Sequence, residues 1–409
     1  MAILEGIRIQ NYRALHDVTL GRTIDRKGDA LPRLMAVIGA NGVGKSSLLD
    51  ALGFIGDCLT EGVESACDKP HRGGFERLRT QGQTGPIQFE IRYREDSKSS
   101  TINYTLEIDI DKHARPQVMR ERLRQSRDGG KVVGKPFSFV DLKQGKGFAW
   151  AGLAAGEDKE GAAKLAVRLS DRQVLGVSTL GTLSDHPRIS AFRSFLSGWY
   201  LSYFVPQLAR SQPVSGAEPH LDRTGENLSK YLQYVERQRP KEFQRMLAKL
   251  SKKVPGLVKI ASNTESPDRR LLLEFHAQGY KAPFFQQDMS DGTLKFLAYL
   301  LLMEDPLPAP LVGIEEPENG LHHQLLGLLA SEFKSFAQTS HGPQVLITTH
   351  APSLIDALSP DEVWILDKDK HGFATATRAA DIETVQAMFD EGLPMGSLWY
   401  SNHFGISGT

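Results

Sequence analysis

The sequence lacks cysteine clusters and long apolar runs. Cys58 and Cys67 are its only cysteines, which excludes a disulfide framework and a zinc site built from several thiolates. No stretch of about 18 consecutive apolar residues is present, and the charged N-terminus has no apolar core of the kind that a signal peptide needs. These absences predict a cytoplasmic protein with no membrane partner.

The chain also lacks a net charge. Lys and Arg together number 49, as do Asp and Glu, so no overall field attracts nucleic acid or an anionic membrane. A length of 409 residues can bury a large core, and it predicts two or three domains or one core enlarged by an insertion. Composition therefore argues against a disulfide-rich, thiolate-zinc or membrane-spanning protein, and it does not indicate an activity.

Apolar patterning at the start of the chain predicts strands and one long helix. The segments 3–10 and 17–20 are typical of a hairpin, and 34–39 is a continuous apolar run typical of a central strand. Leucine and isoleucine then recur at helical spacing, at positions 48, 52, 55 and 59. Four alternating segments separated by turns predict an antiparallel sheet, at 87–93, 102–110, 117–125 and 137–142.

The rest of the chain predicts helices and then a second series of buried strands. Helix-like patterns cover 189–204 and 226–250, after a small and polar stretch at 151–187. Apolar strands then alternate with helices, with strands at 271–275, 311–316, 345–350 and 363–369 and helices at 293–303 and 322–337. Because buried strands that alternate with helices form parallel sheets, we expect an α/β fold with a largely parallel central sheet.

The segment GANGVGKS, Gly39 to Ser46, has the spacing G-x-x-x-x-G-K-[ST] between a predicted strand and a predicted helix. Glycines at such a turn let backbone N–H groups surround phosphates at the helix N-terminus. Lys45 is then placed to reach the terminal phosphates, and the Ser46 hydroxyl to ligate Mg²⁺. The segment predicts a nucleoside triphosphate site; the alternative is a chance glycine turn.

Two adjacent glutamates, Glu315 and Glu316, end the apolar run LVGIEE. A carboxylate removed from water needs a compensating charge, and a bound cation supplies one. Glu315 is therefore predicted to hold Mg²⁺, and Glu316, one residue beyond the strand, to orient or deprotonate the attacking water. In the alternative interpretation both are solvated charges at a strand end.

Two further motifs lie at the ends of predicted elements. In MSDGT, Ser290 or Asp291 can cap a helix, and Gly292 allows close approach of the backbone to a ligand at an N-terminus that attracts phosphate. VLITTH places His350 at the carboxyl edge of a buried strand, where ligands collect in parallel sheets. Alone, each has a plain alternative: a capped helix, and a histidine bonded to backbone.

Taken in order, GANGVGKS, MSDGT, LVGIEEPENGLH and ITTH resemble the phosphate loop, signature, acidic strand and switch histidine of ABC-type ATPase heads. The opening IRIQNYRALHDVTL resembles the first hairpin of the RecF, SMC and OLD group. IEEPENGLH is most similar to small standalone prokaryotic ATPases of the OLD-like branch. The resemblance covers roughly residues 1–60 and 285–370, and it implies a P-loop NTPase fold of the ABC head type with Mg²⁺-dependent hydrolysis of ATP.

The resemblance also implies roles for individual residues. Glu316 is the general base, His350 is the switch, and the triphosphate is lined by Gly39, Asn41, Gly42, Gly44, Lys45, Ser46 and Ser47. Heads of this type form ATP-dependent head-to-tail homodimers, in which the signature of one subunit, here Ser290 to Thr293, closes over the ATP of the other. Two positions depart from the wider family, which has Asp at Glu315 and a serine followed by two glycines where SDGT stands here.

A glutamine loop normally follows the first helix of such heads. Gln81, Gln83 and Gln88 are candidates for it, and Arg72 in HRGGF is a candidate to approach the nucleotide. Four parts are predicted along the chain: residues 1–84 and 281–409 as the two parts of the ATPase core, 85–150 as an antiparallel β subdomain, and 151–280 as a mainly helical insertion. The aromatic segment GSLWYSNHFG, at 396–405, either completes the core or anchors a partner.

Two functions stay open at this point. The first is a dimeric ATP-driven switch that acts through a separately encoded effector in anti-phage defence, since the residues after 369 are too few for the Toprim nuclease module of OLD proteins. The second is a RecF-like DNA-binding ATPase in repair or recombination. Cations between 112 and 146 favour the second, although an exposed sheet face explains them more simply: Arg115, Arg120, Arg122, Arg124, Arg127, Lys131 and Lys135.

Overall fold

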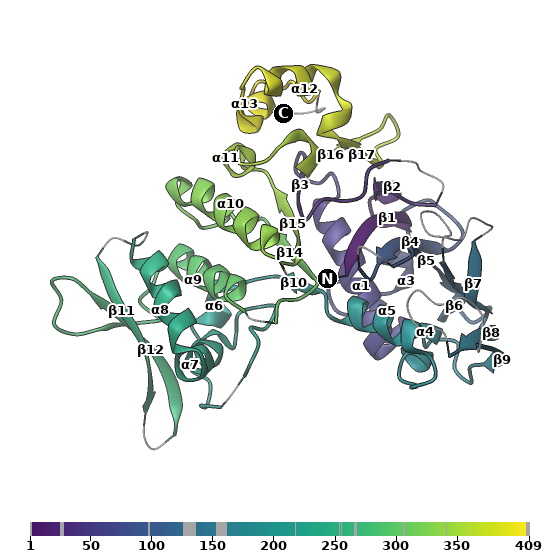
Figure 1. Cartoon of the computed structure of the whole chain (residues 1–409), viewed down its shortest axis with the longest axis horizontal. Coiled ribbons are helices and arrows are strands. Elements are labelled where there is room, and N and C mark those ends of the chain that lie inside the picture. The colour runs from purple at the N-terminus through teal and green to yellow at the C-terminus, as the bar shows by residue number, and fades with distance from the viewer. Residues whose placement is uncertain are drawn as a thin grey trace.

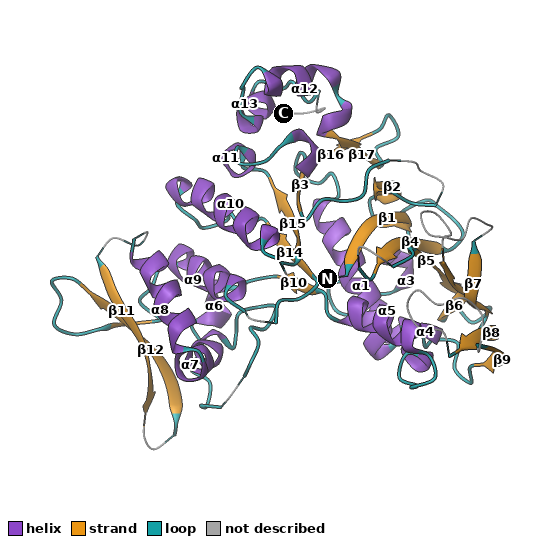
Figure 2. Cartoon of the chain, viewed as in Figure 1, coloured by secondary structure: helices purple, strands orange, loops and turns teal. Residues whose placement is uncertain are grey.

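The computed structural model describes residues 2–24, 28–96, 99–125, 136–152, 162–216, 218–252, 254, 256–265, 268–305, 307–340 and 342–405. Its strands form a six-stranded sheet at the centre of the molecule, an eight-stranded sheet on one side and a three-stranded sheet on the other (Figures 1 and 2). Helices lie between and around these sheets. The α/β class expected from the sequence is confirmed.

The central sheet has the order β10–β14–β15–β3–β16–β17, and all neighbours are parallel except β16 and β17. In β3, Leu34, Ala36 and Ile38 point into one hydrophobic core, whereas Met35 and Val37 point into another. This strand is therefore buried on both faces, as its continuous apolar run predicts. In sheet order the strands are Tyr200–Ser202, Leu311–Glu315, Gln344–Thr349, Leu34–Ile38, Val363–Lys368 and Ala374–Arg378.

The eight-stranded sheet has the order β2–β1–β4–β5–β6–β7–β8–β9, and every neighbouring pair is antiparallel. The predicted hairpin and the four alternating strands after it are confirmed. The last two strands extend the sheet, and β9 was missed because it is mostly exposed and has no buried alternation. In sheet order the strands are Leu15–Gly21, Ile3–Tyr12, Ile87–Arg94, Ile102–Ile110, Pro116–Gln125, Phe137–Lys143, Lys146–Ala151 and Ala163–Arg168.

The helices contribute to two hydrophobic cores. One core joins the eight-stranded sheet to α1, α2, α4 and α5, and the other surrounds α7 to α10 and the C-terminal helices. In Figure 1 the central strands lie between these two halves. The helices are α1 Lys45–Glu61, α2 Val63–Cys67, α3 Phe75–Leu78, α4 Gly176–Leu180, α5 Pro187–Ser197, α6 Pro206–Ala209, α7 Leu228–Gln238, α8 Pro240–Ser251, α9 Asp291–Met303, α10 His323–Gln338, α11 Pro352–Ile355, α12 Glu383–Asp390 and α13 Met395–Tyr400, with short 3-10 turns η1 Pro360–Glu362 and η2 Ala379–Asp381.

Two element predictions are wrong. The helix expected at 189–204 ends at Ser197, and the residues after Gly198 turn back to form β10, which pairs with β14 at the edge of the central sheet. The run LLLEF does not enter the central sheet. It lies in β12 (Arg270–Ala277), which pairs antiparallel with β11 (Leu257–Glu265) and β13 (Phe284–Phe285) in the small separate sheet.

The predicted insertion contributes to more than one layer of the molecule. Elements of the range 151–280 occur in all three sheets, and the four-part division of the chain stays a prediction. At the C-terminal end, Leu398, Trp399 and Phe404 are buried, whereas Tyr400 is 87% exposed. Most of this aromatic segment therefore completes a core. In the part of the chain that the structure describes, no helix combines the length and apolar character that a membrane crossing requires.

Candidate functional site

The phosphate loop lies between β3 and α1, at the carboxyl edge of the central sheet. Helix α1 begins after Gly44, which is left-handed with φ 119° and provides no side-chain cap, so the N–H groups of the first turn are left for a ligand. The Lys45 ammonium turns back over the loop and donates to the carbonyl oxygens of Gly39 at 2.8 Å and Ala40 at 3.1 Å. Lys45 itself is only 5% exposed.

The surroundings of the loop explain two of its glycines. A Cβ at Gly39 would stand 2.3 Å from the Leu366 carbonyl oxygen of β16, and Gly44 packs against Ala14 of the first hairpin. Any larger residue at Gly39 would displace the neighbouring strand. Asn41, Gly42 and Ser46 are exposed and Ser47 is half-buried, so the side of the loop that a triphosphate would occupy is open.

The acidic pair lies beside this loop. Glu315 ends β14 and is aligned with Thr348 of β15, and the Glu316 N–H donates to the Thr348 carbonyl oxygen at 2.9 Å. Glu316 has φ +41°, a left-handed conformation that a non-glycine residue rarely adopts, and such strain is concentrated at functional sites. Asn319 holds its carboxylate in place by donating Nδ2 to Oε2 at 2.8 Å.

Charge links the loop to the acidic strand. Burial lowers the pKa of Lys45, and the negative charges of Glu316, Glu318 and Glu315, in that order, oppose this effect. The structure therefore brings together the lysine and the two glutamates that the sequence predicts for one site. It adds a third glutamate, Glu318, which the sequence prediction did not include.

His350 follows β15 and faces the same glutamates. Its Nδ1 lies 3.5 Å from Glu316 Oε1 and 3.2 Å from Glu318 Oε1, and 45% of its side chain is exposed. Glu318 is buried, and its Oε1 also accepts hydrogen bonds from the Thr349 hydroxyl and the His350 N–H, both at 2.7 Å. The only sequence signal for Glu318 is the clustering of three glutamates in EEPE.

The signature segment begins helix α9. Ser290 caps this helix, because its Oγ accepts from the Thr293 N–H at 3.2 Å, and Asp291 pairs with Arg210 at 2.5 Å. A Cβ at Gly292 would lie 2.5 Å from the Gly320 carbonyl oxygen, so this glycine permits close packing against the turn that follows Glu316. Ser290 and Asp291 are exposed.

A buried lysine joins the signature helix to the acidic turn. Lys295 Nζ donates to the carbonyl oxygens of Glu316 at 3.0 Å and Asn319 at 3.1 Å. Burial lowers the pKa of this lysine, and the charges of Glu318 and Glu316 oppose the effect. Lys295 and Arg210 were both missed from sequence, because neither residue stands inside a recognisable motif.

These groups fit a nucleoside triphosphate with a divalent cation. The amides at the start of α1 and the Lys45 ammonium supply positive charge, while Glu315 and the Ser46 hydroxyl are oxygen ligands of the kind that Mg²⁺ prefers. The second oxygen of Glu318, Oε2, is buried without a hydrogen-bond partner among the described residues. A buried acceptor with no partner is unfavourable in isolation, so this carboxylate oxygen is available to accept a hydrogen bond from a ligand or its bound water.

The family described as "AAA domain, putative AbiEii toxin, Type IV TA system" matches residues 34–356. The chain belongs to this AAA domain family. The matched range contains the phosphate loop, the signature segment, the acidic strand and His350. This match assigns the chain to an ATPase family, and together with the fold of the solved heads described next it confirms the ABC-type head expected from the motifs. No curated protein matches the sequence.

Solved SMC heads share the fold of this AAA family member. One, an SMC head bound to the C-winged helix domain of ScpA, has a TM-score of 0.53 at 13% identity and covers 91% of this chain and 96% of its own. Another, an Smc head domain with an extended coiled coil bound to the C-terminal domain of ScpA derived from Pyrococcus furiosus, has a TM-score of 0.53 at 12% identity and covers 96% and 99%. At these identities the likeness establishes the fold alone.

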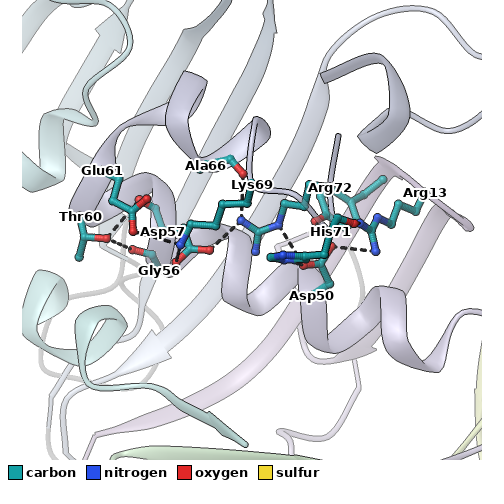
Figure 3. A network of polar contacts seen from close by, with 11 residues as sticks. Arg13, Asp50, Gly56, Asp57, Thr60, Glu61, Ala66, Lys69, His71 and Arg72 are labelled. Atoms are coloured by element: carbon teal, nitrogen blue, oxygen red, sulfur yellow. Dashed lines mark hydrogen bonds and ion pairs between the residues drawn. The ribbon is translucent and has the colours of Figure 1, made fainter. Parts of the chain in front are cut away.

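Arg72 lies in a different cluster, shown in Figure 3. Its guanidinium donates to Asp50 at 2.9 Å and to Asp57 at 2.7 Å, and only 2% of its side chain is exposed. Arg13 and His71 also approach Asp50, and Lys69 binds Asp57 at 2.8 Å. Arg72 therefore has no surface left for a nucleotide, contrary to the expectation from HRGGF. The glutamine-loop candidates Gln81, Gln83 and Gln88 stay predictions.

Several cations of the predicted DNA footprint have acidic partners. Arg115 pairs with Glu64 at 2.8 Å, and Arg120 and Arg122 both approach Asp141, at 3.5 and 3.1 Å. These pairs match the interpretation of an exposed, one-sided sheet. Arg127, Lys131 and Lys135 lie outside the described residues.

Proposed function

We propose that this AAA family member binds and hydrolyses ATP with Mg²⁺ as a homodimeric switch, and that its nucleotide state controls a separate effector protein. The observation that carries the proposal is the convergence of Lys45, Glu315, Glu316 and His350 at one edge of the parallel sheet. Three glutamates act on the Lys45 charge, and Glu316 Oε1 lies 3.5 Å from His350 Nδ1. An acid, a cation and an imidazole are thus held beside an open phosphate loop.

Each residue has one task in the proposed reaction. Lys45 and the amides of the loop hold the phosphates, and Ser46 and Glu315 hold the cation, directly or through water. Glu316 accepts the proton of the attacking water, and Asn319 keeps the carboxylate in position for this. ATP with its bound Mg²⁺ would supply the phosphoryl group and neutralise the charge that builds up on it.

Homodimerisation is proposed because the signature segment is exposed in the single chain. Ser290 and Asp291 stand at the start of α9, and in the described part of the chain they make no contact with the phosphate loop of the same subunit. A helix N-terminus favours bound phosphate. The second subunit would bring these residues to the ATP of the first. The effector is proposed from two names: the family description refers to a putative toxin, and the similar SMC heads are bound to ScpA. An anti-phage role fits such a toxin system.

The test is steady-state ATP turnover by the full chain, compared with Glu316→Gln and with Glu391→Gln, an exposed glutamate after α12. Loss of a general base lowers turnover by about 10² to 10⁴-fold, so Glu316→Gln should become almost inactive, still bind ATP and accumulate dimer. Glu391→Gln should behave as wild type. A protein that stays monomeric in light scattering at saturating ATP and Mg²⁺ would contradict the proposal.

The same assay includes duplex DNA at low and physiological salt. DNA-independent turnover supports control through a protein partner. Stimulation by DNA that falls steeply as salt rises would favour the RecF-like alternative instead, because neutralised phosphates make affinity strongly dependent on salt.

A further inference from the structure

We propose that Glu318 is the positioning residue for His350, and that the two side chains act as a glutamate–histidine pair that presents the imidazole Nε2 to the terminal phosphate. This inference rests on the proposed function, because it assigns a role in ATP turnover. It concerns a residue outside the phosphate loop and the acidic pair. The order of residues along the chain does not indicate it, because Glu318 meets His350 only in the folded structure.

Glu318 fixes both the backbone and the ring of His350. Its Oε1 accepts from the His350 N–H at 2.7 Å and lies 3.2 Å from the His350 Nδ1. The same oxygen accepts from the Thr349 hydroxyl at 2.7 Å, which anchors the carboxylate to the end of β15. Because the Glu318 side chain is only 5% exposed, water competes little for these contacts.

The pairing also selects which ring nitrogen faces the ligand. Nδ1 stands against two carboxylates, those of Glu318 at 3.2 Å and Glu316 at 3.5 Å, so it carries the proton and donates. Nε2 is then the nitrogen left to face the triphosphate, and it donates to a phosphate oxygen once it is protonated as well. A partner on one imidazole nitrogen generally sets the tautomer and orientation of the other, and it is this control that we assign to Glu318.

The charge of Glu318 acts on two lysines from different parts of the site. Its negative charge acts on Lys45 of the phosphate loop and on Lys295 of the signature helix. Its Oε2 is buried and has no hydrogen-bond partner among the described residues. A glutamate whose only role was to hold a loop in place would be expected to accept hydrogen bonds through both carboxylate oxygens, because an unpartnered buried acceptor is unfavourable.

The chain contains a matched control for a purely structural glutamate. Glu362 is also buried, and its Oε2 accepts from the N–H and hydroxyl of Ser359, both at 3.0 Å, in the capping box of η1. It thus binds one backbone amide and one hydroxyl, as Glu318 does. Its other partner is Lys334, and among the described residues it forms no hydrogen bond or ion pair with the phosphate loop or His350.

The first experiment compares Glu318→Gln, Glu362→Gln, His350→Ala and the Glu318→Gln/His350→Ala double variant of the full chain. We expect Glu318→Gln to lower kcat by about 10 to 100-fold, the usual effect of losing such a partner, with little change in KM or in binding of a fluorescent ATP analogue. Glu362→Gln should keep the wild-type kcat. In the His350→Ala background the Glu318 substitution should have almost no further effect, because the two residues act as a unit.

Three results would overturn the inference. The first is a kcat for Glu318→Gln equal to that of Glu362→Gln. The second is a loss of ATP binding as large as the loss of turnover. The third is an undiminished effect of Glu318→Gln in the His350→Ala background. If Glu318→Gln does not fold, Thr349→Val replaces it. That variant removes the hydroxyl at 2.7 Å from Glu318, and it should give a smaller loss of kcat that likewise disappears in the His350→Ala background.

A second measurement does not depend on turnover. Nitrogen NMR of histidine-labelled protein, at about pH 8.5 where an ordinary imidazole is neutral, reports which ring nitrogen carries the proton. The His350 signal, assigned with His350→Ala, should show the Nδ1–H form in wild type and a shift toward the Nε2–H form in Glu318→Gln. An unchanged tautomer refutes the pairing. A wild-type protein that hydrolyses no ATP refutes the proposed function instead, and the NMR result still decides the pairing.

Discussion

Two buried charge clusters lie near helix α1 and differ in how their charges are compensated. Around Arg72, each buried carboxylate has cations within reach: Asp50 has Arg72 at 2.9 Å and Arg13 at 3.1 Å, and Asp57 has Arg72 at 2.7 Å and Lys69 at 2.8 Å (Figure 3). Around Lys45, the ammonium is bonded to two backbone carbonyls, and a carboxylate oxygen of Glu318 is buried with no hydrogen-bond partner in the described part of the chain. The first cluster is complete within the chain. The second has capacity for a ligand.

This difference separates a structural network from a binding site better than residue type does. Both clusters contain a basic side chain and buried acids, and the sequence suggested a nucleotide contact for each. Breaking a saturated buried pair leaves an unpaired charge and destabilises the fold. Removing a group from an unsaturated site chiefly removes ligand binding, because its contacts within the chain are few. Substitutions at Lys45 and at Arg72 should therefore separate a loss of ATP binding from a loss of stability.

The largest effect is expected at the unsaturated site. Lys45→Ala should weaken ATP binding by at least about 30-fold, because truncating one member of a buried charge pair removes 2 kcal/mol or more. Its free energy of unfolding without nucleotide should change little, since among the described residues the Lys45 ammonium is hydrogen-bonded only to loop carbonyls. Titration with a fluorescent ATP analogue and urea denaturation measure the two quantities. Lys241→Ala, an exposed position in α8, is the control.

The saturated network should show the opposite pattern. Arg72→Met should lower the free energy of unfolding by about 3 kcal/mol or more, the usual effect of breaking a buried pair, while folded molecules bind ATP normally. Arg245→Met provides the comparison, because Arg245 pairs with Glu304 but is 60% exposed, and such pairs contribute about 1 kcal/mol or less. If Arg72→Met lost ATP affinity without losing stability, the division between the clusters would be wrong.

A single hydrogen bond in the network should have a smaller effect. The Tyr12 hydroxyl donates to Asp50 Oδ2 at 2.7 Å, and Tyr12 is fully buried. Tyr12→Phe should lower the free energy of unfolding by about 1 to 2 kcal/mol. Tyr93→Phe is the control, because Tyr93 is also buried and no hydrogen bond joins its hydroxyl to a carboxylate among the described residues. Equal losses of unfolding free energy at the two positions would show that the hydrogen bond from Tyr12 to Asp50 adds no stability.

The smallest effect is a dependence on pH. Burial raises the pKa of Asp57, but hydrogen bonds from Lys69 and Arg72 outweigh it and hold the pKa below its ordinary value. The stability from this carboxylate is therefore complete above the ordinary aspartate pKa of about 3.9 and is lost as pH falls through the lowered folded value. The difference in unfolding free energy between wild type and Asp57→Asn should be constant from about pH 7 to 5 and shrink below about pH 4. A difference that widened in acid would contradict this assignment.

Sequence patterning predicted most of the central and antiparallel sheets. Continuous apolar runs indicated β3, β14 and β15, and alternation indicated β4 to β7, because burial on two faces or one face leaves those patterns. The same logic explains the errors. A three-residue strand such as β10 is too short for periodicity, and an apolar run such as LLLEF cannot show whether its neighbours are parallel.

The candidate site was predicted in part for a similar reason. Lys45, Glu315, Glu316 and His350 stand in segments with fixed spacing at strand ends, so their meeting follows from a parallel sheet. Glu318, Lys295 and Arg210 have no such spacing. Their contacts depend on how the turn after β14 packs against α9 and on the loop that follows α6, and these tertiary details leave no local pattern.

The position of β3 also has a consequence for synthesis of the protein. Both of its neighbours come from the far end of the chain: Leu34 pairs with Val345 of β15, and Ala36 pairs with Val363 of β16. A nascent chain on the ribosome would therefore expose the strand before the phosphate loop, without its flanking strands, until β15 and β16 had also emerged. Chains that stop before β16 would lack the strands on both sides of β3, so ATP binding requires that the chain has been made at least as far as Lys368.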